Sequence, residues 1–215
     1  MFITFEAGEG AGKSTQARRL TEALRDLGHD VVLTREPGGS PLAEDLRAFV
    51  VQGEPDRMDA LTELLIFTAA RRDHIRRTIV PALERGAIVI CDRYLGSTHA
   101  LQGAGGTPAS LIDMLHGAFC ELTPDLTIYL EMDPEAGLER AMRRLSDAQA
   151  CEGRFEAKGE DFHRKVDAIF RDQCAKCPEW QAVNAAGTIE QVGERVLEVV
   201  TSHPEFPTNA LERAV

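Results

Sequence analysis

The sequence lacks the long apolar segments of a membrane protein. No run reaches the 18 residues that a transmembrane helix needs, and the chain enters a predicted strand at once, without the basic region or cleavage site of a signal peptide. Basic residues are few, because 24 Lys and Arg stand against 35 Asp and Glu, a net charge of −11. This balance argues against a general nucleic-acid-binding surface, although it permits local basic pockets. We therefore expect neither a membrane nor a nucleic-acid partner.

Cysteine is also scarce. The chain has five, an odd number scattered from Cys91 to Cys177, which is typical of free thiols in a reducing cytoplasm. Cys174 and Cys177 have the C-x-x-C spacing of a zinc-binding pair, but a closed zinc site needs a second pair and the sequence has none. We expect two thiols on one helix face, with zinc binding as the less favoured interpretation, and a cytoplasmic location.

What is present is the composition of a soluble enzyme, with 43% hydrophobic and 27% charged residues. A chain of 215 residues favours one domain, or one domain with a small lid, and it can bury a full core without disulfides or a metal. We expect a single domain over residues 1–202, with a lid at about 144–159 and a C-terminal tail over 203–215.

A glycine-rich loop, A-G-E-G-A-G-K-S-T, follows the apolar run Met1–Phe5 and precedes a predicted helix. In such a loop the backbone N–H groups turn inward around phosphate oxygens at a helix N-terminus. Lys13, expected on the surface of the loop, would reach the terminal phosphates, and Ser14 would take a place on Mg²⁺. Ala7 replaces the first glycine of the usual pattern, which is tolerable only if its φ is negative. The predicted phosphate-binding residues are Ala7, Gly8, Glu9, Gly10, Ala11, Gly12, Lys13, Ser14 and Thr15.

Predicted strands and helices alternate along the chain. The strands are expected at residues 2–5, 30–34, 87–91, 126–131 and 181–184, with helices between them, of which the one over 42–51 has Ser40 as its expected N-cap. This order predicts an α/β protein with a parallel five-stranded sheet and helices on both faces. Ligands of such folds bind beyond the carboxyl ends of the strands, where the phosphate loop and Asp92-Arg93 both lie.

A long helix is predicted over residues 58–85, with a kink at Pro81. Its expected buried stripe is Leu61, Leu65, Ile75, Ile79 and Leu83, which share a narrow arc at 100° per residue. Arg72 falls within this stripe, and a buried arginine needs an anionic partner.

Three further groups of residues carry candidate chemistry, each with a structural alternative. Asp92 and Arg93 would hold Mg²⁺ and a phosphate at a strand tip, or form an exposed ion pair. Arg35 and Glu36 precede Pro-Gly-Gly in a tight loop, which is either aimed at the cleft or a plain turn. Phe67 and Arg71, at i and i+4, would sandwich and hydrogen-bond a nucleobase, or be a core phenylalanine beside a surface arginine.

A polar segment over 145–159 carries the last candidates. Arginines in a mobile loop can close over transferring phosphates, and the alternative is a disordered surface loop. The basic residues that frame the segment are Arg143, Arg144, Arg154 and Lys158.

Together these motifs resemble the bacterial thymidylate kinases, a branch of the P-loop nucleoside monophosphate kinases, over about residues 1–202. The most specific pieces are E-x-x-E-G-A-G-K at Glu6–Lys13, T-R-E-P-G-G at Thr34–Gly39, F-x-A-A-R at Phe67–Arg71, and D-R-Y with S-T-x-x-x-Q-G at Asp92–Gly103. The sequence P-D-L-T-x-Y-L at Pro124–Leu130 also fits. The resemblance implies phosphoryl transfer from ATP to dTMP with Mg²⁺ on the chain's metal-binding residues Ser14 and Asp92, in a homodimer formed through long helices.

The resemblance also implies residue roles. The catalytic residues would be Lys13, Asp92, Arg93 and Arg154. One branch of the family has a catalytic arginine where Gly10 stands here, so the resemblance implies an arginine from the lid, with Arg154 as the first candidate and Arg143 and Arg144 as alternatives. Phe67 would stack on thymine, and Arg71 would donate to one of its carbonyls. The substrate-binding set is Glu9, Arg35, Glu36, Arg47, Phe67, Arg71, Arg93, Ser97, Thr98 and Gln102.

One departure concerns the acceptor sugar. Leu101 stands where the family often has a tyrosine near the sugar 2′ position, so discrimination against ribonucleotides is open. Two rival functions also stay open: a kinase for another pyrimidine monophosphate such as dUMP, and a nucleotide-binding regulator that has lost catalysis.

Overall fold

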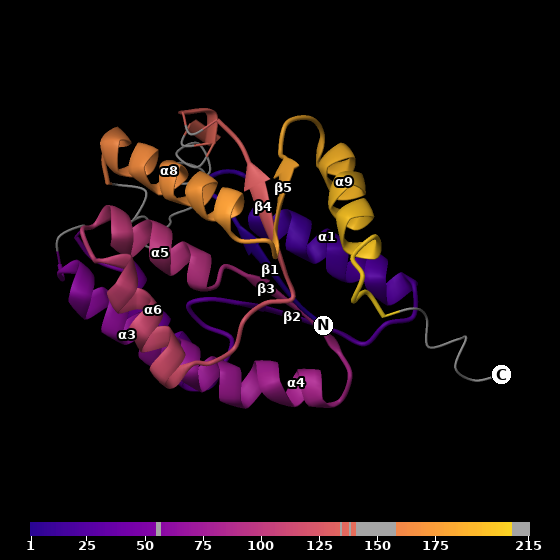
Figure 1. The fold of residues 1–215 in the computed structure, drawn as a ribbon, viewed down its shortest axis with the longest axis horizontal. Coiled ribbons are helices and arrows are strands. Elements are labelled where there is room, and N and C mark those ends of the chain that lie inside the picture. Colours follow the sequence, from indigo (N-terminus) through magenta and orange to yellow (C-terminus); the bar gives the residue numbers. More distant parts are fainter. Residues whose placement is uncertain (55–56, 134, 138, 141–157, 208–215) are drawn as a thin grey trace.

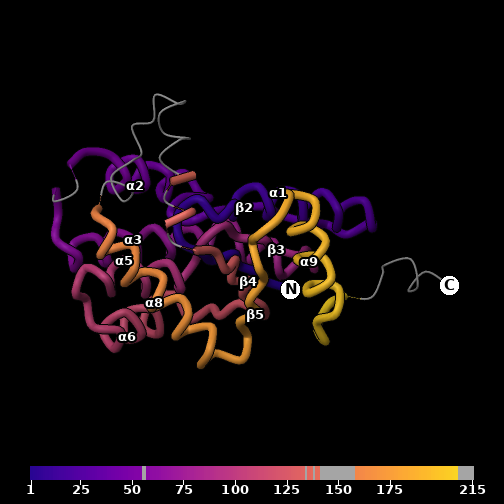
Figure 2. Tube along the Cα trace, turned by 90° about the horizontal axis from the view of Figure 1, so that it is seen from above, coloured from indigo at the N-terminus to yellow at the C-terminus, as the bar shows by residue number. Residues whose placement is uncertain are grey.

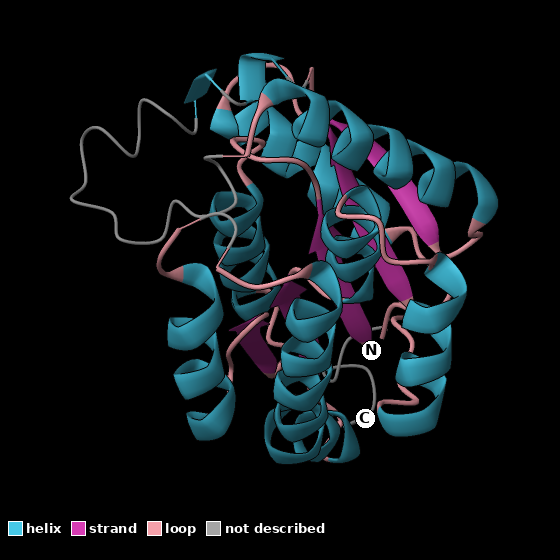
Figure 3. Cartoon of the chain, turned by 90° about the vertical axis from the view of Figure 1, so that its left-hand side faces the viewer, coloured by secondary structure: helices cyan, strands magenta, loops and turns pink. Residues whose placement is uncertain are grey.

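A parallel sheet forms the centre of the protein. The computed structural model describes residues 1–54, 57–133, 135–137, 139–140 and 158–207. Within them the sheet has five strands in the order β2-β3-β1-β4-β5. They are β1 (Phe2–Glu6), β2 (Val31–Arg35), β3 (Ile88–Asp92), β4 (Leu126–Glu131) and β5 (Trp180–Asn184). Helices cover both faces (Figures 1 and 3), so the predicted fold class is confirmed.

The helices divide between the two faces. On one face α1 (Lys13–Asp26) runs beside the C-terminal α9 (Ile189–Thr201), as Figure 2 shows. The remaining helical elements pack on the other side, where α4 contacts β3 and α8 contacts β5. They are α2 (Pro41–Val51), α3 (Ala60–His74), the π-helical turn η1 (Ile75–Ile79), α4 (Val80–Glu84), α5 (Leu95–Ala104), α6 (Ala109–Phe119) and α8 (Glu160–Lys176).

Alternation along the central strands sends apolar side chains into clusters on opposite faces of the sheet. Ile3 and Phe5 of β1 point toward α1 and α9, whereas Phe2 points toward η1 and α4. On β3, Ile88 and Ile90 belong to the first cluster and Val89 to the second. Successive side chains of a strand face opposite sides, so a strand covered on both faces is apolar at nearly every position. This pattern explains why the continuous apolar runs in the sequence predicted these strands to within about a residue.

The predicted stripe of the long helix is wrong in its first half. Leu61 and Leu65 are 47% and 51% exposed, while Leu64 and Phe67 are buried in their place. The chain is not one helix here, because the π turn separates α3 from α4, and Val80 N–H bonds back to the carbonyl of Ile75. A π turn is wider than an α turn and shifts the phase of the buried face. The helix is therefore interrupted by the π turn at Ile75–Ile79, just before Pro81, where the kink was predicted.

Two side-chain predictions in this region change as a result. Arg72 is exposed and donates to the Phe119 carbonyl at 2.7 Å, so it needs no buried anion. Ser40 is at the N-cap of α2 as expected, but its hydroxyl donates to Asp73 at 2.7 Å instead of capping the helix.

Among the described helices, none combines the length and the apolar character that crossing a membrane requires.

Candidate active site

The carboxyl ends of β1, β2 and β3 bring three sequence motifs to one edge of the sheet. Strand β1 lies between β3 and β4, and β3 lies between β1 and β2. The parallel register places Phe5 beside Asp92 and Arg35 beside Asp92. The phosphate loop, the loop after Arg35 and the Asp92-Arg93 segment therefore emerge together, and a cleft of about 470 Å³ opens above them.

The phosphate loop has the backbone that its glycines permit. Gly10 and Gly12 have φ of 71° and 89°, and Gly12 is the N-cap of α1. Ala7 is fully buried and does not belong to the residues with positive φ, so the condition for replacing glycine there is met. A Cβ at Gly10 would overlap the backbone of Gly137. The loop therefore has no room for an arginine at this position.

Lys13 lies inside the loop. It is 7% exposed, so the expectation of a surface lysine is wrong. Its ammonium donates to the carbonyls of Gly8 at 2.7 Å and Ala7 at 3.1 Å, because the loop curls around the aliphatic stem. Burial, with the charge of Arg93 as a second cause, lowers the pKa of Lys13 from 10.5 to about 8.

Ser14 at the start of α1 and Asp92 at the end of β3 bring a hydroxyl and a carboxylate together. The Ser14 hydroxyl donates to Oδ2 of Asp92. The other carboxylate oxygen, Oδ1, is buried and has no hydrogen-bond partner in the described part of the chain. A hydroxyl and a free carboxylate oxygen suit a hard cation such as Mg²⁺, which prefers oxygen ligands.

Arg93 crosses the cleft in a constrained conformation. Its φ is 73°, in the left-handed region, and its guanidinium donates to Glu9 at 2.5 Å and to the Ser97 hydroxyl at 3.0 Å. Beneath it, Glu6 accepts from Tyr94 N–H at 2.9 Å and from the Ser97 hydroxyl at 2.5 Å. Burial raises the pKa of Glu6 against the lowering effects of Ser97 and Arg93. The turn after β3 is thus held from below by a buried carboxyl.

The loop after β2 brings one exposed and one buried side chain to the cleft. Arg35 is exposed at the cleft and pairs with Glu44 at 3.0 Å. Glu36 is buried and accepts from Nε of Arg71 at 2.7 Å. Although burial opposes ionisation of Glu36, Arg71 and His74 outweigh it, so the pKa of Glu36 lies below its ordinary value. Both side chains line the cleft, as the first of the two interpretations of this loop expected.

Arg71 is a buried arginine, and not a surface one. Besides Glu36 it donates from Nη2 to Thr98 at 2.8 Å, and its guanidinium lies 4.8 Å from the centre of the Tyr94 ring. Phe67, one turn earlier on α3, lines the same end of the cleft and is 8% exposed. An aromatic face and a guanidinium thus meet in one pocket, a combination suited to a planar heterocycle.

Gln102 lies in the wall of this pocket. It is fully buried, and its Nε2 donates to Glu63 at 3.1 Å. Because a carboxylate accepts hydrogen bonds, this contact orients the amide and leaves Oε1, which has no partner among the described residues, as an acceptor. Leu101 also lines the cleft and packs against the buried cluster of Val50, Val51 and Phe67, so its side chain contributes both to the apolar core and to the pocket wall.

The cleft brings together most of the predicted site residues. Those that line it are Glu9, Gly10, Gly12, Lys13, Ser14, Thr15, Arg35, Glu36, Arg47, Phe67, Arg71, Asp92, Arg93, Ser97, Thr98 and Gln102. Gly8 and Ala11 lie behind the loop, against a smaller cavity. Arg18, Pro37, Val51 and Tyr94 also line the cleft but were not among the predicted site residues, and Glu6 had no predicted role. Their positions depend on contacts between distant segments, although Glu6 and Tyr94 stood within the quoted motifs.

The predictions for the lid fall outside the described residues. These are Arg143, Arg144 and Arg154, together with nearly all of the segment 144–159. Lys158 is described, and its ammonium lies 4.0 Å from Glu63 and 4.7 Å from the centre of the Phe162 ring.

A phosphate loop after the first strand of a parallel sheet, in one cleft with Phe67 and Arg71, is the arrangement of a P-loop kinase fold. The sequence model described as thymidylate kinase matches residues 5–196. The chain belongs to the thymidylate kinase family, and it is accordingly an enzyme of the kinase class.

Individual relatives agree with this assignment. The thymidylate kinase of Ruegeria pomeroyi is 48% identical over 205 residues, which cover 94% of this chain and 95% of that protein. The thymidylate kinase of Caulobacter vibrioides is 47% identical over 93% of this chain and 95% of its own length. Among solved structures, thymidylate kinase from Ehrlichia chaffeensis superposes with a TM-score of 0.75 at 33% identity, covering 93% of this chain and 97% of that one.

The lowered pKa of Lys13 predicts a pH-dependent affinity for a nucleoside triphosphate. The bound phosphates favour the charged lysine, whereas the free protein loses this proton as the pH rises through about 8. We expect the dissociation constant to rise about tenfold between pH 7 and pH 9. The measurement is calorimetric titration across this range. In Lys13→Arg the guanidinium stays charged, so a dependence that survives this change would contradict the assignment to Lys13.

Proposed function

We propose that this chain transfers the γ-phosphoryl group of ATP to dTMP, giving ADP and dTDP, with Mg²⁺ as cofactor. The observation that carries the proposal is a single cleft with a phosphate loop at one end and the Phe67–Arg71 pocket at the other, in a member of the thymidylate kinase family. The two substrates then meet end to end above the sheet. This activity belongs to the supply of dTTP, and the location that fits it is the cytoplasm.

The pocket chemistry supports a thymine base. Hydrogen bonds occupy Nε and Nη2 of Arg71 and leave Nη1 for a ligand, while Oε1 of Gln102 is an unpartnered acceptor among the described residues. A thymine ring offers carbonyl acceptors beside an N–H donor, so one edge satisfies both groups. Phe67 supplies the face on which the ring stacks. Ser97, Thr98 and Arg47 complete the pocket in this proposal.

Positive charge supports the phosphate end. Arg93 and Arg35 would bind the dTMP phosphate, Lys13 the β- and γ-phosphates of ATP, and the loop amides the remaining oxygens. In the structure Arg93 pairs with Glu9, and we infer that the incoming phosphate takes up the guanidinium and frees Glu9 to face the sugar 3′-hydroxyl. The acceptor oxygen attacks the γ-phosphorus directly, without a covalent enzyme intermediate.

Ser14 and Asp92 would hold the Mg²⁺ ion, which neutralises charge on the phosphates when bound. The unpartnered Oδ1 of Asp92 supports this role. Because Gly10 has no room for a side chain, a catalytic arginine must come from elsewhere, and Arg154 of the proposed lid stays our prediction. The domain limits at residues 1–202 also stay a prediction.

We further propose a homodimer formed through α3 and α6, which pack against each other. Four large apolar side chains on these helices are 47–57% exposed: Leu61, Leu65, Met114 and Phe119. Burying such side chains against a second copy removes apolar surface from water.

Loss of the Lys13 ammonium tests the reaction. Lys13→Met keeps the buried stem but removes the charge, so we expect kcat to fall about 10²–10⁴-fold with little change in melting temperature. The assay is coupled ADP release with and without dTMP, and Lys176→Met, on the exposed face of α8, is the matched control. ADP release that ignores dTMP would indicate a different acceptor, and its complete absence in the wild type would favour the regulator.

Arg71→Lys tests the acceptor pocket. The lysine retains a charge near Glu36 but loses the planar fork, so the KM for dTMP should rise about tenfold or more while the KM for ATP stays within about twofold. Arg76→Lys, on the exposed side of η1, should change neither constant. An equal rise in both KM values for Arg71→Lys would make Arg71 a structural residue only.

The apolar surface of α3 tests the homodimer. We expect the mass from light scattering to correspond to two chains in the wild type and to one chain in Leu65→Glu, because a charge in a buried apolar interface is costly. Leu27→Glu changes a leucine of similar exposure at the end of α1, on the opposite face, and should leave the dimer intact. A wild-type monomer at assay concentration would refute the dimer without affecting the proposed reaction.

A further inference from the structure

A series of buried hydrogen bonds connects Arg71 to the sheet. His74, the last residue of α3, is fully excluded from solvent. Its Nδ1 lies 3.0 Å from Oε1 of Glu36, and its Nε2 lies 2.7 Å from the hydroxyl of Thr34 on β2. The second oxygen of Glu36 accepts from Nε of Arg71. Hydrogen bonds thus run without a break from the sheet, through His74 and Glu36, to the guanidinium in the cleft wall.

The direction of these hydrogen bonds follows from the carboxylate. Arg71 and His74 lower the pKa of Glu36 despite its burial, so the group is ionised and only accepts. Nδ1 of His74 therefore carries a proton toward Glu36. In the neutral ring, Nε2 then accepts from the Thr34 hydroxyl, which selects this tautomer. Each carboxylate oxygen of Glu36 thus accepts one hydrogen bond, Oε1 from His74 and Oε2 from Arg71.

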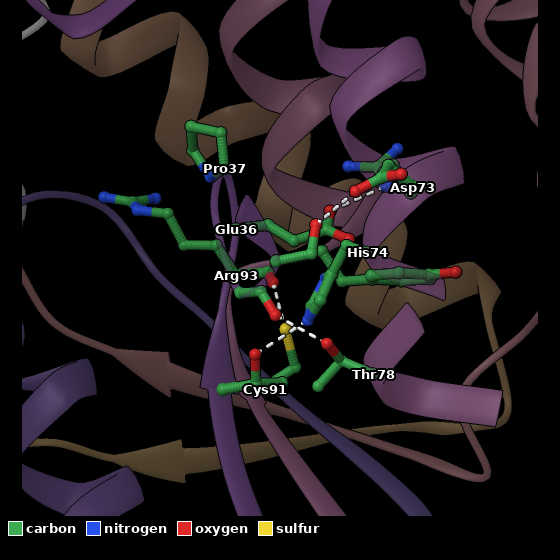
Figure 4. Close-up of polar contacts among 12 residues, drawn as sticks. Glu36, Pro37, Asp73, His74, Thr78, Cys91 and Arg93 are labelled. Carbon is green, nitrogen blue, oxygen red and sulfur yellow. Dashed lines mark hydrogen bonds and ion pairs between the residues drawn. The ribbon is translucent and has the colours of Figure 1, made fainter. Parts of the chain in front are cut away.

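The surrounding contacts hold the Glu36 loop to the same helical segment. Figure 4 shows Asp73, His74 and Thr78 directed at this loop from one side. Asp73 accepts from Ser40, and the Thr78 hydroxyl donates to the carbonyl of Gly39 at 2.6 Å. The π turn begins directly after His74 and brings Thr78 onto this side.

Gly39 leaves the space that the chain of contacts needs. Its φ is 82°, and a Cβ there would overlap both the His74 ring and the Thr34 hydroxyl. Two observations, the missing Cβ and the matched contacts on both ring nitrogens, indicate a built position for the imidazole and not a histidine that merely fills a core.

We propose that His74 is a positioning residue for acceptor binding, which holds Glu36 so that Glu36 sets the plane of the Arg71 guanidinium and directs Nη1 at the acceptor base. The inference rests on the proposed role of Arg71 in binding dTMP. Glu36 at Nε and Thr98 at Nη2 are the two points that define this plane. Without His74, Oε1 loses its donor, and a carboxylate free to rotate no longer orients the arginine.

Three substitutions of His74 separate positioning from packing. In asparagine the amide nitrogen lies near the position of Nδ1, so His74→Asn keeps the donor to Glu36. In glutamine the amide reaches the position of Nε2, so His74→Gln keeps only the contact with Thr34. His74→Leu keeps neither. We expect the KM for dTMP to rise about tenfold in the glutamine and leucine variants, with the KM for ATP unchanged, and to stay within about threefold of the wild type in His74→Asn.

Base selectivity provides a readout that a merely structural role would not move. Cytosine has an amino group in place of one thymine carbonyl, so a guanidinium held in a fixed plane rejects it. The ratio of kcat/KM for dTMP to that for dCMP should therefore fall in His74→Gln and His74→Leu and be retained in His74→Asn. Thr34→Val should raise the KM for dTMP by a smaller factor, about threefold. Thr4→Val removes a buried hydroxyl bonded to Thr127 on the neighbouring strands, and should have no effect on either KM.

Several results would overturn the proposal. A folded His74→Leu or His74→Gln with wild-type KM and selectivity would make the ring a packing element, as would equal rises in both KM values. His74→Asn as impaired as His74→Gln would exclude the contact between Nδ1 and Glu36 as the cause. Arg71→Lys, measured alongside, distinguishes failure of the proposed role of Arg71 from failure of the inferred role of His74. If Arg71→Lys leaves the KM for dTMP unchanged, the proposed role of Arg71 is wrong. If Arg71→Lys raises this KM and the His74 variants do not, only the inference about His74 is contradicted.

Discussion

The parallel pairing of β1, β2 and β3 is the constraint on which the site depends. All three strands end at the same edge, so the loops that follow them converge whatever their separation in sequence. Arg35, Asp92 and the phosphate loop meet there although Ser14 of the loop and Asp92 lie 78 positions apart in the sequence. The apolar clusters on either side of the sheet hold this register, because a slip by one residue would exchange the faces of every strand.

Buried carboxylates are the second layer of the construction. Glu36 holds Arg71, and Glu6 holds the turn that carries Arg93, so these two arginines of the cleft each depend on a buried acid. A buried charge is costly unless it is paired and fully hydrogen-bonded. The pairs therefore keep the basic groups of an acidic protein in defined positions before any ligand enters. Preorganised charge of this kind is what phosphoryl transfer by positioning requires.

Local patterns predicted the strands and the phosphate loop well, and failed where a helix buries polar groups. The apolar stripe assigned to residues 58–85 counted Leu61 and Leu65, yet the buried side of α3 holds Glu63, Arg71 and His74. A rule based on apolar periodicity does not detect a polar face that is paired inside the protein. Nor did it anticipate the π turn, which changes the phase of the face within one helical segment.

The sequence by itself determined the class of fold and the phosphate loop, because each follows from patterns among near neighbours in the chain. The spacing of glycines around Lys13 and the apolar strands need no distant partner to be recognised. Only the tertiary structure decided that Lys13 is buried, that Arg71 pairs with Glu36, and that His74 is hydrogen-bonded to the other oxygen of Glu36. These pairings join segments 35–38 positions apart, and they exist because the sheet and α3 press the segments together and exclude the water that would otherwise satisfy their charges.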